Sequence, residues 1–543
     1  MMEESLEAEV GRVPSESSSP ADQRGHAAVG RRRAGWTWLG LALLGLAGVG
    51  VVLVATPWGA GLGGDSYYYV SGARSLLAGL GFARPAADGG FRVITHYPPG
   101  YSLALAALTA TGIDTLVAAR WLAATLFGLN VALAGALVFR VTRSAWPAWS
   151  AGLLVLGSPA LIVTHTWVLS ESLFLFLALL LLIALGRAAE RGTAWRVVSA
   201  GFVAGMAYLT RYVGVALIGA GGLALLAFGA GALRRRLSTA FGFGVAAVLG
   251  PALWAARNLA QSGSISYRAQ SLHPPSLERL FEAAETSSLW LLPSRFPSPL
   301  REGAALLLVI LVVVLAARVL ARGPSVAAPT GLKQQVGVVL SLAVVYPLSL
   351  VAAITLVGSS VPLDDRILSP LLVALLVLGV LVVWDLQQRA GRGGALRIGL
   401  AVAAVGFLAL TLVRGAGSIR RLQADGQGAA ARAWQESALI DWVRRLPAET
   451  AIYSNELDII YLYTGRQVYQ APIRWDPVLE APRHDYSEQL ATMREAILHR
   501  GAVLVLFDTI GGQQAFLPSR EELSEGLSEW LRADDGAVYG AAQ

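Results

Sequence analysis

Residues 34–69 read AGWTWLGLALLGLAGVGVVLVATPWGAGLGGDSYYY, and this stretch indicates the fold. No charged residue occurs between Ala34 and Gly64, and Asp65 then opens an aromatic segment that leads to HYPPGY at residues 96–101. About 20 consecutive apolar residues can cross a bilayer as a helix, so the stretch predicts a membrane span followed by a polar loop. An acidic, aromatic loop directly after a span favours a membrane enzyme whose chemistry lies just outside the bilayer.

The composition of the whole chain agrees with a membrane protein. Of its 543 residues 55% are hydrophobic and only 15% are charged, whereas soluble domains carry roughly 25% charged residues. The net charge is +7, but the arginines are scattered along the chain and form no single basic face, which argues against nucleic-acid binding. The absence of cysteine excludes disulfides and thiolate metal sites.

Apolar runs recur along the first three quarters of the chain. By the length criterion of about 20 residues they predict about eleven membrane helices, and the segment 99–111 is expected to be a short re-entrant or interfacial helix. The predicted spans are residues 35–57, 114–140, 147–165, 170–187, 197–211, 213–230, 238–256, 302–320, 335–357, 367–386 and 397–413.

The charges of the short loops predict the orientation. With the N-terminus inside, all basic clusters of short loops fall on one side, as the positive-inside rule requires. Residues 1–34 are polar and are expected to be a disordered cytoplasmic segment. The loop 58–113 and the tail 414–543 then lie outside. These basic residues are Arg31, Arg32, Arg33, Arg140, Arg143, Arg187, Arg191, Arg196, Arg234, Arg235, Arg236, Arg318, Arg322, Lys333, Arg389, Arg392 and Arg397.

The tail after residue 413 changes in character. It is polar, with strand-like residues 451–454 and 502–507 and helix-like stretches near 430–446, 456–464, 487–500 and 518–532. We therefore expect an all-α polytopic membrane domain, residues 35–413, followed by a small α/β extracytoplasmic domain, residues 414–543.

Asp65 is the first candidate for chemistry. It could accept or orient a hydroxyl proton, or it could simply cap a helix over 66–78. The tyrosines that follow it, including Tyr68, favour the functional interpretation. His96 could meet a phosphate, or it could be an interfacial histidine. Pro98 and Pro99 force a turn at the membrane surface, and the neighbouring Tyr97 and Tyr101 could be interfacial aromatics.

Three arginines lie at predicted outer ends of helices. Arg366 could bind phosphate through its planar fork, or it could be a helix-end arginine paired with Asp365. Arg211 and Arg257 have the same two interpretations. Glu171 begins a predicted helix, where the helix dipole favours a carboxylate. It could also serve with Asp65 as a second acidic group, or hold a divalent cation together with His165, although two residues are too few to define a metal site.

The order of these motifs resembles the GT-C glycosyltransferases. The similarity is closest to the family 39/83 branch, which includes protein O-mannosyltransferases, the aminoarabinose transferase of lipid A and the RgtA/B/C/D-like bacterial enzymes. The segments that carry the resemblance are Asp65 with residues 73–81 (ARSLLAGLG), 97–101 (YPPGY), 170–172 (SES), 208–211 (YLTR), 257–258 (RN), 262–263 (SG), 365–370 (DRILSP), 452–455 (IYSN) and 463–466 (YTGR).

The resemblance implies an enzyme of the bacterial cytoplasmic membrane that takes a sugar from a polyprenyl-phosphate donor on the outer face. Asp65 would activate the acceptor, and Glu171 would correspond loosely to a second acidic position. His96, Arg366, Arg257 and Arg211 would form the donor-phosphate side. Histidine replaces the more usual lysine at position 96, and the acidic pair of some members is absent because Ser66 follows Asp65.

Two other classes of function compete with this interpretation. A secondary transporter or lipid flippase would place ionisable groups and broken helices near the bilayer midplane, whereas the charges here sit at span ends. A non-catalytic membrane scaffold with the tail as a partner-binding module is the third hypothesis. The sequence leaves the sugar open, together with the choice of lipid, glycan or protein as acceptor.

Overall fold

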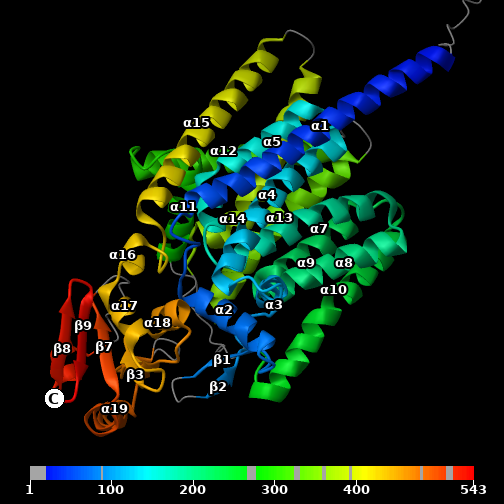
Figure 1. Cartoon of the computed structure of the whole chain (residues 1–543). Coiled ribbons are helices and arrows are strands. Elements are labelled where there is room, and N and C mark those ends of the chain that lie inside the picture. Colours follow the sequence, from blue (N-terminus) through cyan, green and yellow to red (C-terminus); the bar gives the residue numbers. More distant parts are fainter. Residues whose placement is uncertain are drawn as a thin grey trace, which may run out of the picture.

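The computed structural model describes residues 20–86, 90–265, 277–322, 331–357, 362–390, 394–476, 481–508 and 518–542. A bundle of long helices carries a small domain with a mixed sheet at one end (Figure 1). The expected fold class, an all-α membrane domain with a C-terminal α/β domain, is confirmed. Part of the predicted disordered N-terminal segment is helical, because the first helix begins at Pro20; residues 1–19 lie outside the described part.

Each of the predicted spans is helical. Residues 147–165 form two helices, α5 and α6, which meet at an angle of 62°. The helices of the bundle are α1 (Pro20–Ala55), α4 (Thr115–Thr142), α5 (Ala145–Gly157), α6 (Pro159–His165), α7 (Glu171–Arg191), α8 (Ala194–Thr210), α9 (Val215–Phe228), α10 (Leu233–Ser262), α12 (Ser298–Arg322), α13 (Leu332–Val357), α14 (Asp365–Arg389) and α15 (Ala395–Asp425).

Length and composition alone qualify fewer spans than the sequence predicts. Within the described residues eight helices are long and apolar enough to cross a membrane, or nine with the bent pair, against the expected eleven. The difference lies in α8 and α9, which have 17 and 14 residues. Arg211 ends α8 in an extended conformation, and the 3-10 turn Tyr212–Gly214 precedes α9. A charged residue between two apolar runs therefore divides them into short helices.

Small residues let the bundle pack closely. At the crossing of α1 with α4, a Cβ on Gly128 would stand 2.4 Å from the carbonyl oxygen of Gly45. Such close backbone approach is how membrane helices gain packing energy, since lipid supplies no hydrophobic driving force between them. Conversely, α12 and α15 expose many Leu and Val side chains, which suits surfaces that face lipid.

A layer of short elements covers the end of the bundle that bears the small domain. It consists of α2 (Gly64–Leu77), β1 (Ala83–Pro85), β2 (Phe91–Val93), α3 (Gly100–Thr109) and α11 (Leu277–Leu291). The predicted short apolar helix is α3. Its first residue, Gly100, lies so near the end of α8 that a Cβ would stand 2.7 Å from the carbonyl oxygen of Leu209. This contact fixes the Pro-Pro turn against the bundle.

The tail domain contains a five-stranded sheet with strand order β4-β3-β7-β9-β8. Strand β3 pairs in parallel with β4 and β7, and β9 is antiparallel to β7 and β8. The elements are α16 (Arg432–Gln435), α17 (Ala438–Arg445), β3 (Ile452–Ser454), α18 (Leu457–Thr464), β4 (Tyr469–Gln470), β5 (Trp475–Asp476), β6 (Ala481–Pro482), α19 (Tyr486–Arg500), β7 (Val503–Phe507), α20 (Arg520–Ser524), β8 (Ser528–Ala533) and β9 (Gly536–Gly540).

Two predicted boundaries in this region are wrong. The helix expected over 518–532 ends at Ser524, and residues 528–533 form β8. Pairing with β9 across a tight turn outweighs the local helix preference there. The last membrane helix does not stop at residue 413 but continues to Asp425. The compact part of the tail therefore begins after Gly426.

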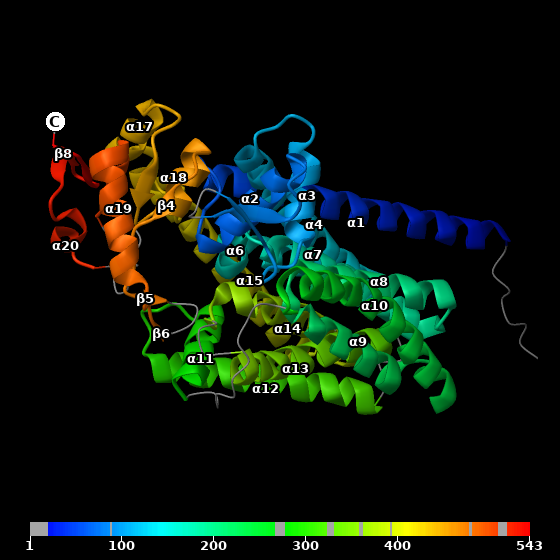
Figure 2. The ribbon, with the colours of Figure 1, turned by 90° about the horizontal axis from the view of Figure 1, so that it is seen from below.

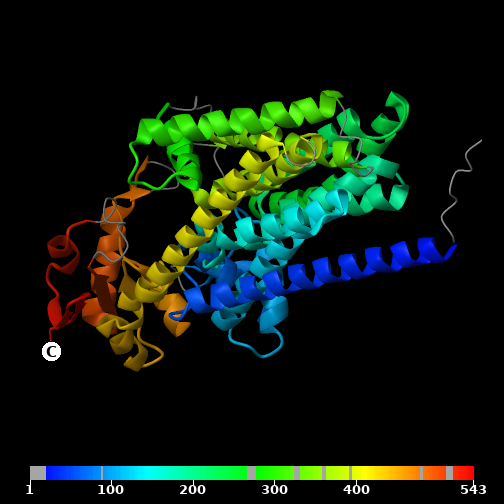
Figure 3. The ribbon, with the colours of Figure 1, turned by 90° about the horizontal axis from the view of Figure 1, so that it is seen from above.

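Figures 2 and 3 show how the two ends of the molecule differ. The tail domain, α2 and α3 gather at one end, while α1 runs from there along the bundle toward its own N-terminus at the other end. The connection between α7 and α8 lies at that far end, because α7 begins beside α2 and runs away from it. The layer that carries Asp65 is thus enclosed by the bundle on one side and the tail on the other.

Candidate active site

The backbone that leads into Asp65 is anchored on both sides. The N–H of Gly61 donates to the carbonyl oxygen of Thr166 at 2.7 Å, and the N–H of Ala429 donates to the carbonyl oxygen of Leu62 at 2.8 Å. The first contact comes from the turn between α6 and α7, and the second from the tail. Helix α2 then begins at Gly64. Asp65 therefore stands in its first turn and is not its N-cap, which is Gly63.

Asp65 is engaged by two other residues of the predicted site. The hydroxyl of Tyr97 donates to Oδ1 of Asp65 at 2.5 Å, and Nη1 of Arg366 lies 3.8 Å from Oδ2. The Asp65 side chain is 38% exposed, so the carboxylate is still open to solvent. Burial, together with the adjacent Asp65 carboxylate, raises the pKa of Tyr97 well above its ordinary value, so Tyr97 stays protonated and donates.

Arg366 lies in the first turn of α14 and faces several carboxylates. Its Nε lies 3.1 Å from Oδ2 of Asp364 and 4.0 Å from Oε1 of Glu171. Asp364 also caps the helix, accepting from the N–H groups of Arg366 and Ile367. The alternative pairing of Arg366 with Asp365 does not occur in the structure, because Asp365 turns away and accepts from Nε1 of Trp290 at 2.8 Å.

Glu171 is the most deeply buried acid of this cluster, with 2% of its side chain exposed. It begins α7, as expected, and its Oε1 lies 2.6 Å from Nη1 of Arg211. The same Nη1 donates to Oγ of Ser170 at 3.2 Å, and that oxygen is 2.8 Å from the hydroxyl of Tyr69. A buried charge costs free energy unless it is paired. The ion pair between Arg211 and Glu171 therefore stabilises both charges near the exposed Asp65.

A group of aromatic rings packs together beside Asp65. The ring of Tyr68 lies 4.5 Å from that of His96 and 4.9 Å from that of Tyr97, and His96 lies 4.6 Å from Tyr97. The guanidinium of Arg84, from β1, stands over Tyr68 at 5.3 Å. His96 therefore lies next to the Asp65 cluster, within a group of rings.

The other predicted residues have structural surroundings. Arg257 donates from Nη1 to the carbonyl oxygen of Ile94 at 2.9 Å and stands over Trp254. It therefore braces the loop and makes no described contact with the Asp65 cluster. Pro98 and Pro99 are buried in the turn before α3. Tyr101 is fully buried, and its hydroxyl has no hydrogen-bond partner among the described residues.

Sequence reasoning missed Tyr69 and Ser170 and did not single out Asp364 as the partner of Arg366. Tyr69 reads as one tyrosine among three, and only the helical spacing from Asp65, four residues earlier, signals that both share a face of α2. Ser170 precedes a helix, where a capping role is the usual interpretation.

The arrangement does not fit a divalent cation. Among the described residues no group of three or more His, Asp or Glu side chains could hold a metal ion. Glu171 already forms an ion pair with Arg211, and Asp65 already contacts Tyr97 and Arg366. Two guanidinium groups, those of Arg211 and Arg366, already lie against the carboxylates of the cluster.

Comparisons with known proteins show where the same fold occurs. The structure is similar to ArnT from Cupriavidus metallidurans bound to undecaprenyl phosphate, with TM-score 0.57 and 14% identity over 93% of this chain and 98% of that one. It is also similar to the archaeal oligosaccharyltransferase AglB from Archaeoglobus fulgidus in complex with an inhibitory peptide and a dolichol-phosphate. That match has TM-score 0.52 and 12% identity over 87% of this chain and 69% of that one. Likenesses at these identities establish the fold.

Residues 65–236 match the family model of dolichyl-phosphate-mannose-protein mannosyltransferases. The chain therefore has the fold of the GT-C membrane glycosyltransferases, and its residues 65–236 resemble the mannosyltransferase family. The matched region begins at Asp65 and contains His96, Glu171 and Arg211, which the structure places around one carboxylate cluster. No protein among the curated sequences matches the chain.

The charged cluster lies at helix ends. Asp65 and Glu171 are in the first turns of α2 and α7, Arg366 is in the first turn of α14, and Arg211 follows α8. Transporters instead place such groups at broken helices near the midplane. The position of the charges therefore favours chemistry at the membrane boundary.

Proposed function

We propose that this glycosyltransferase moves a sugar from a polyprenyl-phosphate carrier to an acceptor outside the membrane. One observation carries the proposal: Asp65, an exposed carboxylate, shares its two oxygens between a tyrosine hydroxyl at 2.5 Å and a guanidinium at 3.8 Å. A hydrogen-bond acceptor for a hydroxyl proton thus stands next to a cation for a phosphate. The bound polyprenyl phosphates of the two solved relatives, and the donor named in the matched family, support the same donor class.

Arg366 supplies the phosphate side of the reaction. Its side chain is 26% exposed, and its contact with Asp65 is long, so an incoming phosphate can replace that carboxylate as its partner. A planar guanidinium binds phosphate oxygens in pairs. His96, whose ring lies 4.6 Å from that of Tyr97, adds a second donor group. Charge that develops on the leaving phosphate is stabilised by these fixed groups, and no general acid is required.

Asp65 acts on the acceptor. When phosphate takes Arg366, Oδ2 of Asp65 becomes free to receive the proton of the acceptor hydroxyl, while Tyr97 holds Oδ1 and orients the carboxylate. The acceptor oxygen attacks the anomeric carbon as the carbon–oxygen bond to phosphate breaks. The proton passes to Asp65, and the polyprenyl phosphate leaves as the anion. A single displacement of this kind inverts the configuration of the anomeric carbon.

The charge distribution supports the orientation. The described arginines of the short loops, such as Arg143, Arg187 and Arg234, lie at the end of the bundle away from Asp65. By the positive-inside rule that end is cytoplasmic. The N-terminus then lies on the cytoplasmic side of the bacterial cytoplasmic (inner) membrane, and the Asp65 layer and tail domain lie on the outer side. The acceptor is a lipid, glycan or protein that reaches this face.

The experiment replaces Asp65 by Asn in the full-length protein. Membranes that contain the protein receive a panel of radiolabelled hexosyl and pentosyl polyprenyl phosphates, and loss of label from the carrier is measured. We expect Asp65→Asn to abolish transfer while the melting temperature is retained, because the amide cannot take the proton. Asp441→Asn, at an exposed position of the tail, is the matched control and should behave like wild type. Full transfer by the Asp65 variant would refute the assignment.

A binding measurement tests the phosphate side separately. Undecaprenyl phosphate without sugar is added to the detergent-purified protein, and its retention is followed by native mass spectrometry. Arg366→Gln should weaken retention by at least tenfold, since one ion pair with phosphate is lost. If retention is unchanged, Arg366 does not bind the donor.

A further inference from the structure

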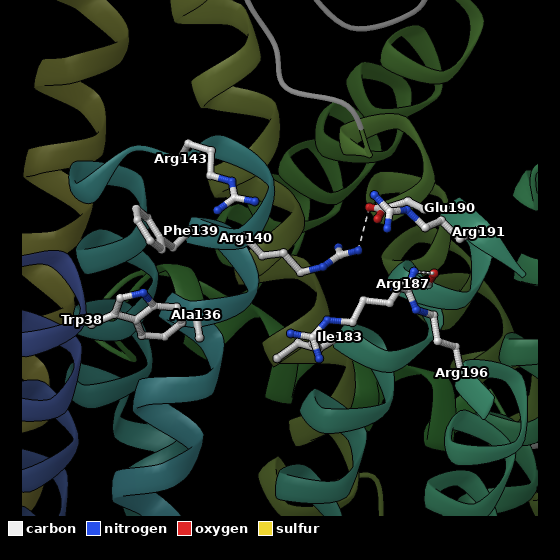
Figure 4. Close-up of a pocket in the computed structure, with 10 residues that line it drawn as sticks. All are labelled: Trp38, Ala136, Phe139, Arg140, Arg143, Ile183, Arg187, Glu190, Arg191 and Arg196. Carbon is white, nitrogen blue, oxygen red and sulfur yellow. Dashed lines mark hydrogen bonds and ion pairs between the residues drawn. The ribbon is translucent and has the colours of Figure 1, made fainter. Parts of the chain in front are cut away.

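A second site lies at the end of the bundle opposite Asp65. It is a cavity of about 320 Å³ between α1, α4 and α7, with Arg196 of α8 at its edge. Figure 4 shows Arg140 and Arg143, from the end of α4, facing Arg187 of α7 across the opening. None of these residues takes part in the proposed glycosyl transfer, so that reaction does not account for the cavity.

The lining of the cavity is strongly cationic. It includes five arginines, Arg140, Arg143, Arg187, Arg191 and Arg196, and one acid, Glu190. Nη2 of Arg140 lies 2.6 Å from Oε1 of Glu190, so this acid is already neutralised. Arg143, Arg187, Arg191 and Arg196 have no ion pair within the described residues. Like charges gathered in one hollow repel each other, and an anion in the hollow would relieve that repulsion.

The cavity is built by buried residues as well as by surface charge. Arg140 is only 13% exposed, and its Nη1 donates to Oε1 of Gln335 at 2.8 Å. Gln335 is fully buried and donates in turn to the carbonyl oxygen of Leu182 at 3.1 Å. The Nε of Arg196 is buried without a hydrogen-bond partner in the described structure. A guanidinium held by hydrogen bonds, with exposed guanidinium groups beside it, is suited to bind a phosphate group.

The surroundings indicate that the anion is attached to a lipid. Trp38 lines the cavity and is 51% exposed, and its ring meets the edge of Phe139 at 5.5 Å. Trp146 and Trp195, near the same ends of the helices, are also exposed. Tryptophans gather at the level of lipid headgroups. Below Trp38, α1 exposes Leu39, Leu43 and Leu46, an apolar surface along which acyl chains can lie.

We propose that this cavity, lined by Arg140, Arg143, Arg187 and Arg196 with Trp38, binds the phosphate headgroup of an anionic phospholipid. Basic pockets between membrane helices bind such headgroups. The phosphate sits between Arg140, Arg143 and Arg187, and the acyl chains follow the exposed face of α1. The lipid cross-links the ends of α1, α4 and α7, and so stabilises the end of the bundle that lacks a tail domain.

The experiment titrates the detergent-purified full-length protein with phosphatidylglycerol and counts bound lipid by native mass spectrometry. Wild type should retain one phosphatidylglycerol in preference to phosphatidylcholine. The double variant Arg143→Gln/Arg187→Gln should bind phosphatidylglycerol at least tenfold more weakly. Both side chains are exposed, so the lipid-free variant should melt like wild type. The matched control, Arg234→Gln/Arg318→Gln, removes two exposed arginines at the same end of the bundle but outside the cavity, and should bind like wild type.

The outcomes distinguish binding of a lipid from binding of a free anion and from non-specific attraction to the net positive charge. Phosphatidylglycerol should raise the melting temperature of wild type but not of the cavity variant, and inorganic phosphate at the same concentration should leave both unchanged. Equal binding by wild type and the cavity variant would overturn the proposal. Equal weakening by the control variant would also overturn it, since it would trace binding to net charge. If inorganic phosphate alone stabilises wild type as much as the lipid does, the site takes a soluble anion.

Discussion

The hydroxyl of Tyr97 and the carboxylate of Asp65 are joined by a 2.5 Å hydrogen bond across the turn that precedes α3. Tyr97 is held in place by the rings of Tyr68 and Tyr69, and Gly100 lets the turn sit directly on α8. The orientation of the Asp65 carboxylate therefore depends on a residue that is itself fixed by packing against the bundle.

Tyr97→Phe should lower the transfer rate without unfolding the protein. A hydrogen bond to a charged group contributes about 1.5–3 kcal/mol, so we expect a loss of about tenfold to a hundredfold in the turnover rate, with a smaller change in donor affinity. Steady-state transfer from labelled donor measures both quantities. Tyr101→Phe is the matched control, because the Tyr101 hydroxyl is buried without a hydrogen-bond partner among the described residues. Its removal should leave the rate unchanged, and equal losses in the two variants would contradict the role of Tyr97.

Glu171→Gln should destabilise the protein. The substitution leaves the guanidinium of Arg211, now 2.6 Å from Glu171, without its carboxylate in a nearly buried position. Removing one partner of a buried pair costs about 3–5 kcal/mol. Thermal unfolding in detergent should show a clearly lowered midpoint, and the double variant Glu171→Gln/Arg211→Met should recover much of it. If the double variant is less stable than Glu171→Gln alone, the two residues do not act as a pair.

Asp458 should make the stability depend on pH. Burial raises the pKa of Asp458 from 3.8 to about 7, although Arg84 nearby lowers it. The folded protein thus holds this proton to a higher pH than the unfolded chain does, and stability should fall as the pH rises from about 4 through 7. Melting temperatures across this range test the slope. Glu456 has a pKa of about 7 for the same reason, so Asp458→Asn should reduce the slope and the further change Glu456→Gln should remove most of the rest.

The control for this pH dependence is Asp441→Asn, at an exposed position of the same domain. It should keep the slope of wild type. A slope that is unchanged in the Asp458 variant would show that other groups set the pH dependence.

Much of the fold was predictable because the membrane restricts both the structure of apolar runs and the positions of charged residues. Runs of membrane-spanning length must form helices, since a lipid-exposed backbone has no other hydrogen-bond partners, and each predicted run is helical. Charges must avoid span interiors, so Asp65, Glu171, Arg211 and Arg366 were expected at one face, and the structure brings them together. The chemical roles of these residues stay predictions.

The pairing of individual side chains was not predictable. Asp364 and Asp365 are adjacent in the sequence, and only the rotation of α14 decides that Asp364 meets Arg366 while Asp365 meets Trp290. Arg257 carries the same guanidinium group as Arg366, but it donates a hydrogen bond to a backbone carbonyl oxygen, that of Ile94. Strand β8 forms because it pairs with β9. The local sequence of β8 favours a helix and gives no sign of this pairing.

The bridge between Leu62 and Gly428 joins an early segment of the chain to a very late one. During synthesis Leu62 emerges long before Gly428 exists, and the two must reach the same side of the membrane before they can pair. The backbone that leads into Asp65 can thus reach its final form only after the last membrane helix has been inserted. A truncated or stalled chain would hold every residue of the cluster and still lack a finished backbone around Asp65.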